Sequence, residues 1–133
     1  MSARPYASLD GVSIDNEILP LVVALRSNTA ILTKGSCCGH GKEHAYLDLA
    51  VEGLPGLRLF VAALNRVDEK FSDEAFIDVG LNWSREVVTA CAFDQFPDWV
   101  MLSVTIESIK GPPSAKLLER LAAAFERELR VGS

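Results

Sequence analysis

The sequence predicts an α+β fold, with a mostly antiparallel sheet of about five strands and helices packed on one face. Three observations lead to this class. Apolar residues recur at helical spacing in some segments and alternate with polar residues in shorter segments between them. The resulting order is α-β-β-α-β-β-β-α, and strands joined by short connections pair antiparallel. Of the 133 residues, 49% are hydrophobic, which is enough to build one sizeable core.

We expect a single α+β domain over residues 13–133, preceded by an irregular arm over residues 1–12. The arm is mixed in composition, contains proline and shows no hydrophobic period. The remainder has the length of one domain, without a low-complexity segment or a linker-like stretch.

The first helix is expected between Asp15 and Asn28, where apolar residues lie three and four positions apart. Asp15 or Asn16 is the predicted N-cap, because both side chains accept hydrogen bonds from the first helical turn. Pro20 lacks a backbone donor, so the helix either begins near Leu19 or is kinked there.

Two strands and a second helix are expected next. The first strand ends at Gly35, and the second alternates apolar with polar residues from Ala45 to Val51. Pro55 suits the first turn of a helix, and apolar residues then follow at spacings of three and four up to Phe71.

The second half of the chain predicts three strands and a last helix. The strands are expected at 77–83, 86–93 and 100–106, and their short connections favour an antiparallel meander. Ser114 is the predicted N-cap of a helix whose apolar stripe runs over 117–129.

Charge and composition exclude some classes of function. Eighteen acidic and thirteen basic residues give a net charge of −5 without a Lys/Arg block, so nucleic acid is not an expected partner. No segment has the apolar length of a signal peptide or a membrane span, so we expect a cytoplasmic protein without a membrane partner. The three cysteines, two of them adjacent, do not form a disulfide framework, and reduced thiols are expected.

The segment Ser36–His44 concentrates the reactive side chains of the chain, with two adjacent cysteines and both histidines. Thiolates and imidazoles are the donors that zinc prefers. The candidate metal ligands are Cys37, Cys38, His40 and His44. Structural zinc sites usually draw ligands from two separated segments, so one more donor, such as Cys91 or Asp94, would complete this site.

Three other interpretations of this loop stay open. Backbone N–H groups of a glycine-rich turn bind anions, although the spacing is not that of a P-loop. The candidate anion-binding residues are Ser36, Gly39, Gly41 and Lys42. A cysteine made nucleophilic by a neighbouring imidazolium would make the protein a small enzyme. The simplest interpretation is a tight turn above a buried cysteine.

The Ser-Cys-x-Gly-His motif that begins at Ser36 resembles the signature of small uncharacterised bacterial and phage-encoded proteins. The resemblance covers residues 15–51 and implies no established activity. The motif is also distantly similar to the Ser-Cys-Ser-Gly-Arg element of the wybutosine-synthesising tRNA methyltransferase family, which would imply nucleotide or methyl-donor chemistry. His40 stands in place of the arginine and Cys38 in place of the second serine, so that function is not transferred.

Two further groups of side chains are candidates for a function. The outward face of the predicted sheet carries Tyr46, Asp48, Asp78 and Asn82. Its carboxylates would act with the histidines as an acid/base set or complete a metal site, but a solvated face explains the same alternation. The connection between the last two predicted strands is flanked by Phe93, Phe96 and Trp99, which would cap the core or form a patch for a protein partner.

We therefore expect a small cytoplasmic binding module for a metal ion, with zinc as the candidate, or for a small anion, at Ser36–His44. The alternative is a noncatalytic protein-interaction or structural protein. Such a protein would self-associate through the outward sheet face or the aromatic patch.

Overall fold

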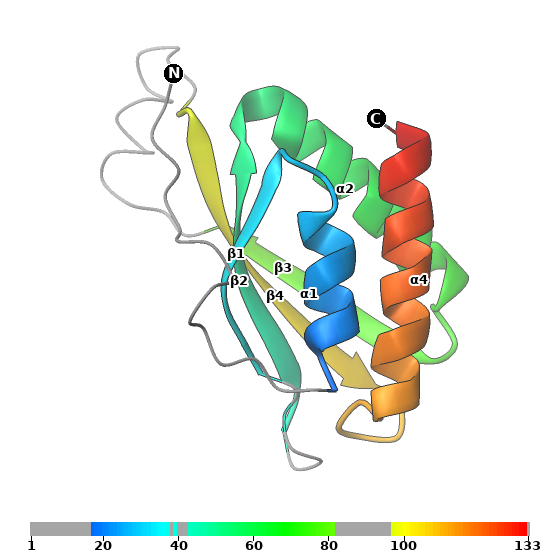
Figure 1. Ribbon diagram of the computed structural model, residues 1–133. Coiled ribbons are helices and arrows are strands. Elements are labelled where there is room, and N and C mark those ends of the chain that lie inside the picture. Colours follow the sequence, from blue (N-terminus) through cyan, green and yellow to red (C-terminus); the bar gives the residue numbers. More distant parts are fainter. Residues whose placement is uncertain (1–16, 38, 40–42, 82–96, 133) are drawn as a thin grey trace.

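The structure is a computed structural model that describes residues 17–37, 39, 43–81 and 97–132. The described elements are α1 (Leu19–Arg26), β1 (Ile31–Cys37), β2 (Ala45–Glu52), α2 (Gly53–Lys70), β3 (Ala75–Leu81), β4 (Trp99–Ser108) and α4 (Ala115–Gly132). Figure 1 shows these helices together on one side of a twisted sheet. The predicted α+β class is thereby confirmed. The predicted arm and the predicted strand 86–93 lie outside the described residues.

The described strands form one antiparallel sheet in the order β1-β2-β4-β3. β4 pairs with β2 along one edge and with β3 along the other, so it is a central strand. The predicted meander is wrong on this point, because β3 and β4 are direct neighbours. Short connections favour sequential pairing, but here the long-range pairing of β4 with β2 determines the order.

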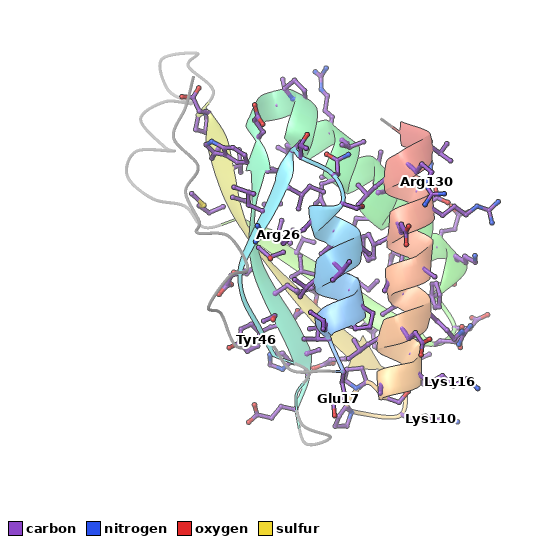
Figure 2. All side chains as sticks on the ribbon, viewed as in Figure 1. Glu17, Arg26, Tyr46, Lys110, Lys116 and Arg130 are labelled. Atoms are coloured by element: carbon purple, nitrogen blue, oxygen red, sulfur yellow. The ribbon has the colours of Figure 1, made fainter. Side chains whose placement is uncertain are left out.

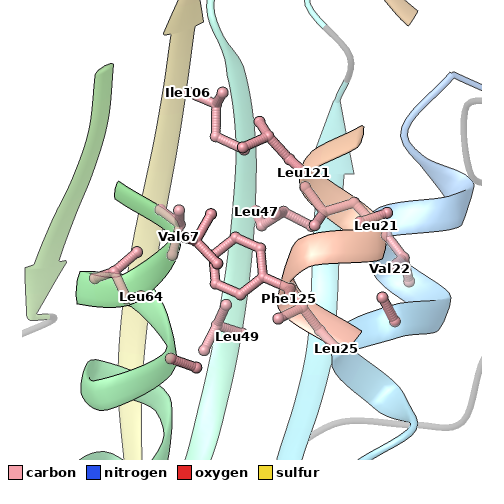
Figure 3. Close-up of a cluster of buried hydrophobic side chains, with 14 of the residues drawn as sticks. Leu21, Val22, Leu25, Leu47, Leu49, Leu64, Val67, Ile106, Leu121 and Phe125 are labelled. Carbon is pink, nitrogen blue, oxygen red and sulfur yellow. The ribbon is translucent and has the colours of Figure 1, made fainter. Parts of the chain in front are cut away.

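The core lies between the sheet and the helices (Figure 3). Strict alternation along β2 and β4 turns every second side chain toward the helices. The residues of the two central strands that are buried against the helices are Ala45, Leu47, Leu49 and Val51 on β2, and Val100, Leu102, Val104 and Ile106 on β4. The rings of Phe60 on α2 and Phe125 on α4 stack with centroids 6.3 Å apart. Removing these side chains from water is the main contribution to stability.

Helix α1 begins at Leu19, one of the two starts predicted from Pro20, and the proline occupies its first turn. The predicted caps Asp15 and Asn16 are wrong. The N-cap is Ile18, whose side chain is fully buried and makes no capping hydrogen bond. Core packing of Ile18 therefore outweighs the preference for a polar cap.

Strand β1 continues to Cys37 instead of ending at Gly35. The register with β2 shifts between Thr33 and Gly35, which is a bulge that lets the strand continue beyond the glycine. At this bulge, Arg26 Nη1 donates to the Thr33 carbonyl at 3.3 Å, beside β1 (Figure 2). Among the described strands β1 is at the edge of the sheet, and this hydrogen bond pairs one of its carbonyl groups.

The two longer helices also test the predicted boundaries. α2 starts at Gly53, two residues before the predicted start at Pro55. For α4, the predicted cap is confirmed, because the Ser114 hydroxyl accepts a hydrogen bond from the Leu117 N–H at 3.1 Å. In the described part of the chain, no helix has both the length and the apolar character that a membrane span requires.

Candidate functional site

The segment with the reactive side chains connects β1 to β2 as a hairpin. Pairing of the two strands extends to Cys37, which lies opposite Tyr46. Ser36 lies opposite Leu47, so it belongs to the paired strand and not to the turn. The predicted loop Ser36–His44 is therefore too long at its first end, because the bulge in β1 carries the strand two residues further.

Gly39 closes the base of this hairpin. Its φ is +83°, a left-handed conformation that side chains with a Cβ rarely adopt. A Cβ on Gly39 would lie 3.0 Å from the carbonyl oxygen of His44. The Glu43 N–H also donates to the Gly39 carbonyl at 3.1 Å. The two ends of the turn are thus held in contact, and only glycine fits at this point.

The predicted metal ligands are only partly within the described residues. The backbone of Cys37 ends β1, and His44 is exposed directly before β2. Cys38 and His40 lie outside the described residues, as do the predicted anion-binding residues Gly41 and Lys42. Within the described ranges, no group of three or more His, Cys, Asp or Glu side chains is positioned to hold a metal ion.

One further donor lies at the same end of the sheet. Ala45, which follows His44, pairs with Ile106 on β4. The next residue after Ile106 is Glu107, whose carboxylate is exposed. The sequence analysis did not identify Glu107, because its position near His44 depends on the pairing of β4 with β2.

The sheet face away from the helices carries the expected polar residues, and Tyr46 projects from it (Figure 2). The Ser103 hydroxyl on β4 donates to Asp48 Oδ1 at 3.0 Å. Asp78 lies beyond β4 on β3, opposite Thr105. The two carboxylates are separated by two strand spacings, about 10 Å, so they do not converge on one ion. Asn82 lies outside the described residues.

Part of that face is apolar and covered. Leu32 and Ala50 pair with each other on it, and both are at most 1% exposed. Tyr46 and Phe76, by contrast, are 40% and 57% exposed. The predicted solvated face therefore holds at Tyr46 and Asp78 but not at Leu32 and Ala50, which are buried. Trp99 is half-buried at the start of β4, and the other two aromatic residues of the predicted patch, Phe93 and Phe96, lie outside the described residues.

Comparisons of the chain with protein-family models, with curated proteins and with solved structures give no match. The resemblance of the motif at Ser36 therefore stays a prediction. The hairpin and its immediate surroundings are the basis on which a function is proposed.

Proposed function

We propose that this protein is a small noncatalytic binding module that holds a transition-metal ion, with zinc as the candidate, in the β1–β2 hairpin. The observation that supports the proposal is the closure of the turn, in which Gly39 lies against the His44 carbonyl. Cys38 and His40 are the covalent neighbours of Gly39, and Cys37 ends the paired strand. The four candidate donors, Cys37, Cys38, His40 and His44, thus lie within eight residues of sequence on either side of Gly39, whose contact with His44 fixes the backbone at that point.

A closed base favours metal binding for an entropic reason. A flexible loop must be ordered before several of its side chains reach one ion, and that ordering opposes binding. Here the backbone hydrogen bond from Glu43 to Gly39 has already ordered the ends of the turn. The exposed His44 offers an imidazole at the mouth of the turn, and Glu107 is a nearby candidate for an additional oxygen ligand.

Zinc is the candidate because its preferred ligands are thiolate and imidazole. Each cysteine must lose its thiol proton and each histidine must be neutral to bind the metal, so the zinc affinity of the site decreases as the pH falls. The anion alternative has less support. Ser36, one of its four residues, lies inside β1 opposite Leu47 and away from the end of the turn.

Thermal unfolding with and without zinc tests the proposal. At a zinc concentration about 100-fold above Kd, binding stabilises the folded chain by about 2.7 kcal/mol. For a chain of this size, that corresponds to a rise in Tm of about 10 °C. Cys38→Ser and His44→Gln should each remove most of the rise. Tyr46→Phe, at the same end of the sheet, should retain it.

Two other results of the thermal unfolding experiment would count against the metal proposal. If zinc still raises the Tm of both Cys38→Ser and His44→Gln, the metal binds elsewhere and the proposal is contradicted. A rise with inorganic phosphate but not with zinc would favour the anion alternative.

The exposed aromatic side chains favour a second candidate, self-association through the sheet face away from the helices. Tyr46 and Phe76 are large, exposed and on that face. The same face carries Asp48, Asp78 and Glu107, whose like charges oppose the pairing of two copies. Salt screens this repulsion, so a dimer should become more populated as ionic strength increases. Sedimentation equilibrium of the chain and of Phe76→Ser would test this, and a concentration-independent monomer mass would exclude it.

A further inference from the structure

A cavity of about 640 Å³ lies at the opposite end of the sheet from the hairpin. Its lining comes from Ala30, from the end of β2 and the first two turns of α2, and from Pro97 and Asp98. We propose that this cavity binds a small organic cation, an ammonium group attached to a hydrocarbon body. The volume lies within the range typical of small-molecule sites, about 300–1,000 Å³.

The walls come from three distant parts of the sequence, and backbone hydrogen bonds hold them together. The Glu52 N–H donates to the Ala30 carbonyl at 2.8 Å, and the Gly53 N–H donates to the Asp98 carbonyl at 2.7 Å. Figure 1 shows the start of α2 beside the start of β4 at this end of the sheet. The cavity is therefore preformed, because separating its walls would break both bonds.

Two glycines allow this close approach. Gly53 has φ of +62°, which turns the chain from β2 into α2 without a Cβ penalty. At Gly56, a Cβ would lie 3.3 Å from the Val51 carbonyl carbon and 3.6 Å from the Ala30 carbonyl oxygen. A larger residue at Gly56 would thus push α2 away from the turn that forms the opposite wall.

The chemistry of the lining selects the ligand class. Leu54, Pro55, Leu59 and Pro97 make most of the surface apolar, which favours a hydrocarbon body. The charged side chains among the described lining residues are Glu52 and Asp98, and both are carboxylates. A cation therefore complements the site, whereas an anion is repelled.

The first turn of α2 does not reverse this preference. A helix start attracts anions through its unpaired N–H groups and its dipole. Here the Gly53 N–H is already bonded to the Asp98 carbonyl, and Pro55 has no N–H to offer. The partial charge of the helix start, about half an elementary charge, is smaller than that of the two carboxylates.

The site is distinct from the hairpin. β2 carries the hairpin at its Ala45 end and the cavity at its Glu52 end, a separation of about 23 Å along the strand. Failure of the metal proposal would leave the cavity proposal unaffected, and the reverse also holds.

Titration of the ¹⁵N-labelled full chain, followed by amide chemical shifts, tests the proposal. The probes are n-hexylammonium, 1-hexanol and hexanoate, which share a chain length and differ in charge. Hexylammonium should produce saturable shifts at the amides of the cavity, hexanol weaker ones, and hexanoate none. The reporting amides are Ala30, Gly53, Leu54, Gly56 and Asp98.

A double variant separates charge from shape. Glu52→Gln with Asp98→Asn removes both carboxylates and keeps the two backbone hydrogen bonds, so the affinity for hexylammonium should fall about fivefold. The double variant should bind hexanol with the same affinity as the wild type. The matched control is Asp68→Asn with Glu69→Gln, which makes the same charge change on the exposed part of α2 and should bind hexylammonium like the wild type.

Three results would overturn the proposal. The first is equal or tighter binding of hexanoate. The second is the absence of saturable shifts with hexylammonium even at millimolar concentration. The third is unchanged hexylammonium affinity in the double variant, because the carboxylates would then not contribute to recognition.

Discussion

At the level of single residues, Gly39 is the glycine, among those in the described part of the chain, that both its backbone conformation and a close contact require. Alanine at this position would need a positive φ and would press its Cβ against the His44 carbonyl oxygen. Gly39→Ala should lower the free energy of unfolding by about 1–2 kcal/mol. Equilibrium unfolding in urea measures this change.

Gly80 provides the matched control for that substitution. A Cβ at Gly80 would meet no atom within 4 Å, and the residue is not among the glycines with positive φ. Gly80→Ala should therefore stabilise the chain slightly, by about 0.5–1 kcal/mol, because alanine loses less backbone entropy on folding. Equal losses in the two variants would show that Gly39 has no special role in the hairpin.

The ion pair between Arg120 and Glu74 predicts a pH dependence of stability. Both guanidinium Nη atoms of Arg120 donate to the Glu74 carboxylate, at 2.5 and 3.0 Å, and the guanidinium also lies over the Phe71 ring. These hydrogen bonds hold the pKa of Glu74 below its ordinary value of 4.5. A lowered folded-state pKa gives stability that is present above the unfolded pKa and is lost as the pH falls through the folded one.

Arg120→Gln should therefore lower Tm at neutral pH, and its difference from the wild type should shrink as the pH falls below 4.5. Circular dichroism melts across this range measure the effect. Arg127→Gln makes the same charge change at an exposed position of the same helix and is the control. A Tm difference for Arg120→Gln that stays constant in acid would contradict the assignment.

The sequence predicted the role of a residue where that role depends on neighbours only a few positions away. Ser114 was identified as a cap because its hydroxyl contacts a backbone N–H three residues later. Ile18 was missed because its capping position follows from burial in the core. The hydrogen bond from Arg26 to Thr33 was missed for a similar reason, since it depends on how α1 lies against β1.

At the level of elements, the amphipathic last helix is essential to the core. Leu121 on α4 is fully buried, whereas Val131, on the same helix, is 69% exposed. Leu121→Ala should lower the free energy of unfolding by about 2–5 kcal/mol through lost burial and a cavity. Val131→Ala should change it by less than about 0.5 kcal/mol. Similar losses in both variants, measured by urea unfolding, would show that α4 is not packed as described.

The periodic spacing of apolar residues predicted most of the described helices and strands. The predicted ends of these elements are wrong where the backbone is irregular. Apolar residues recur at every second position along β2 and β4, and both strands were predicted to within two residues of their ends. The bulge in β1 breaks the alternation at Thr33, so the strand seemed to end at Gly35. That error displaced Ser36 into the predicted loop.

At the level of the whole molecule, the strand order and the cavity at the Glu52 end of β2 could not be predicted from local sequence patterns. β4 lies between β2 and β3 because of pairings between residues about fifty positions apart. The cavity at Glu52 arises from three segments that meet only in the folded chain. The Gly-Leu-Pro-Gly stretch indicated a turn there, but it did not reveal the facing wall at Pro97 and Asp98.

The hairpin, by contrast, was located from composition alone, because two thiols and two imidazoles in nine residues are a strong chemical signal. The structure adds the closure of the turn at Gly39 and the position of His44 beside β2. These two facts connect the fold to the proposed metal site.

The most direct test of that site is the metal content of the untagged chain, purified without chelator and measured by elemental mass spectrometry, with a thiol titration before and after chelation. The proposal predicts near-stoichiometric zinc and thiols that become reactive only after chelation. Metal-free protein with freely titrating thiols, and no zinc uptake on addition, would contradict it.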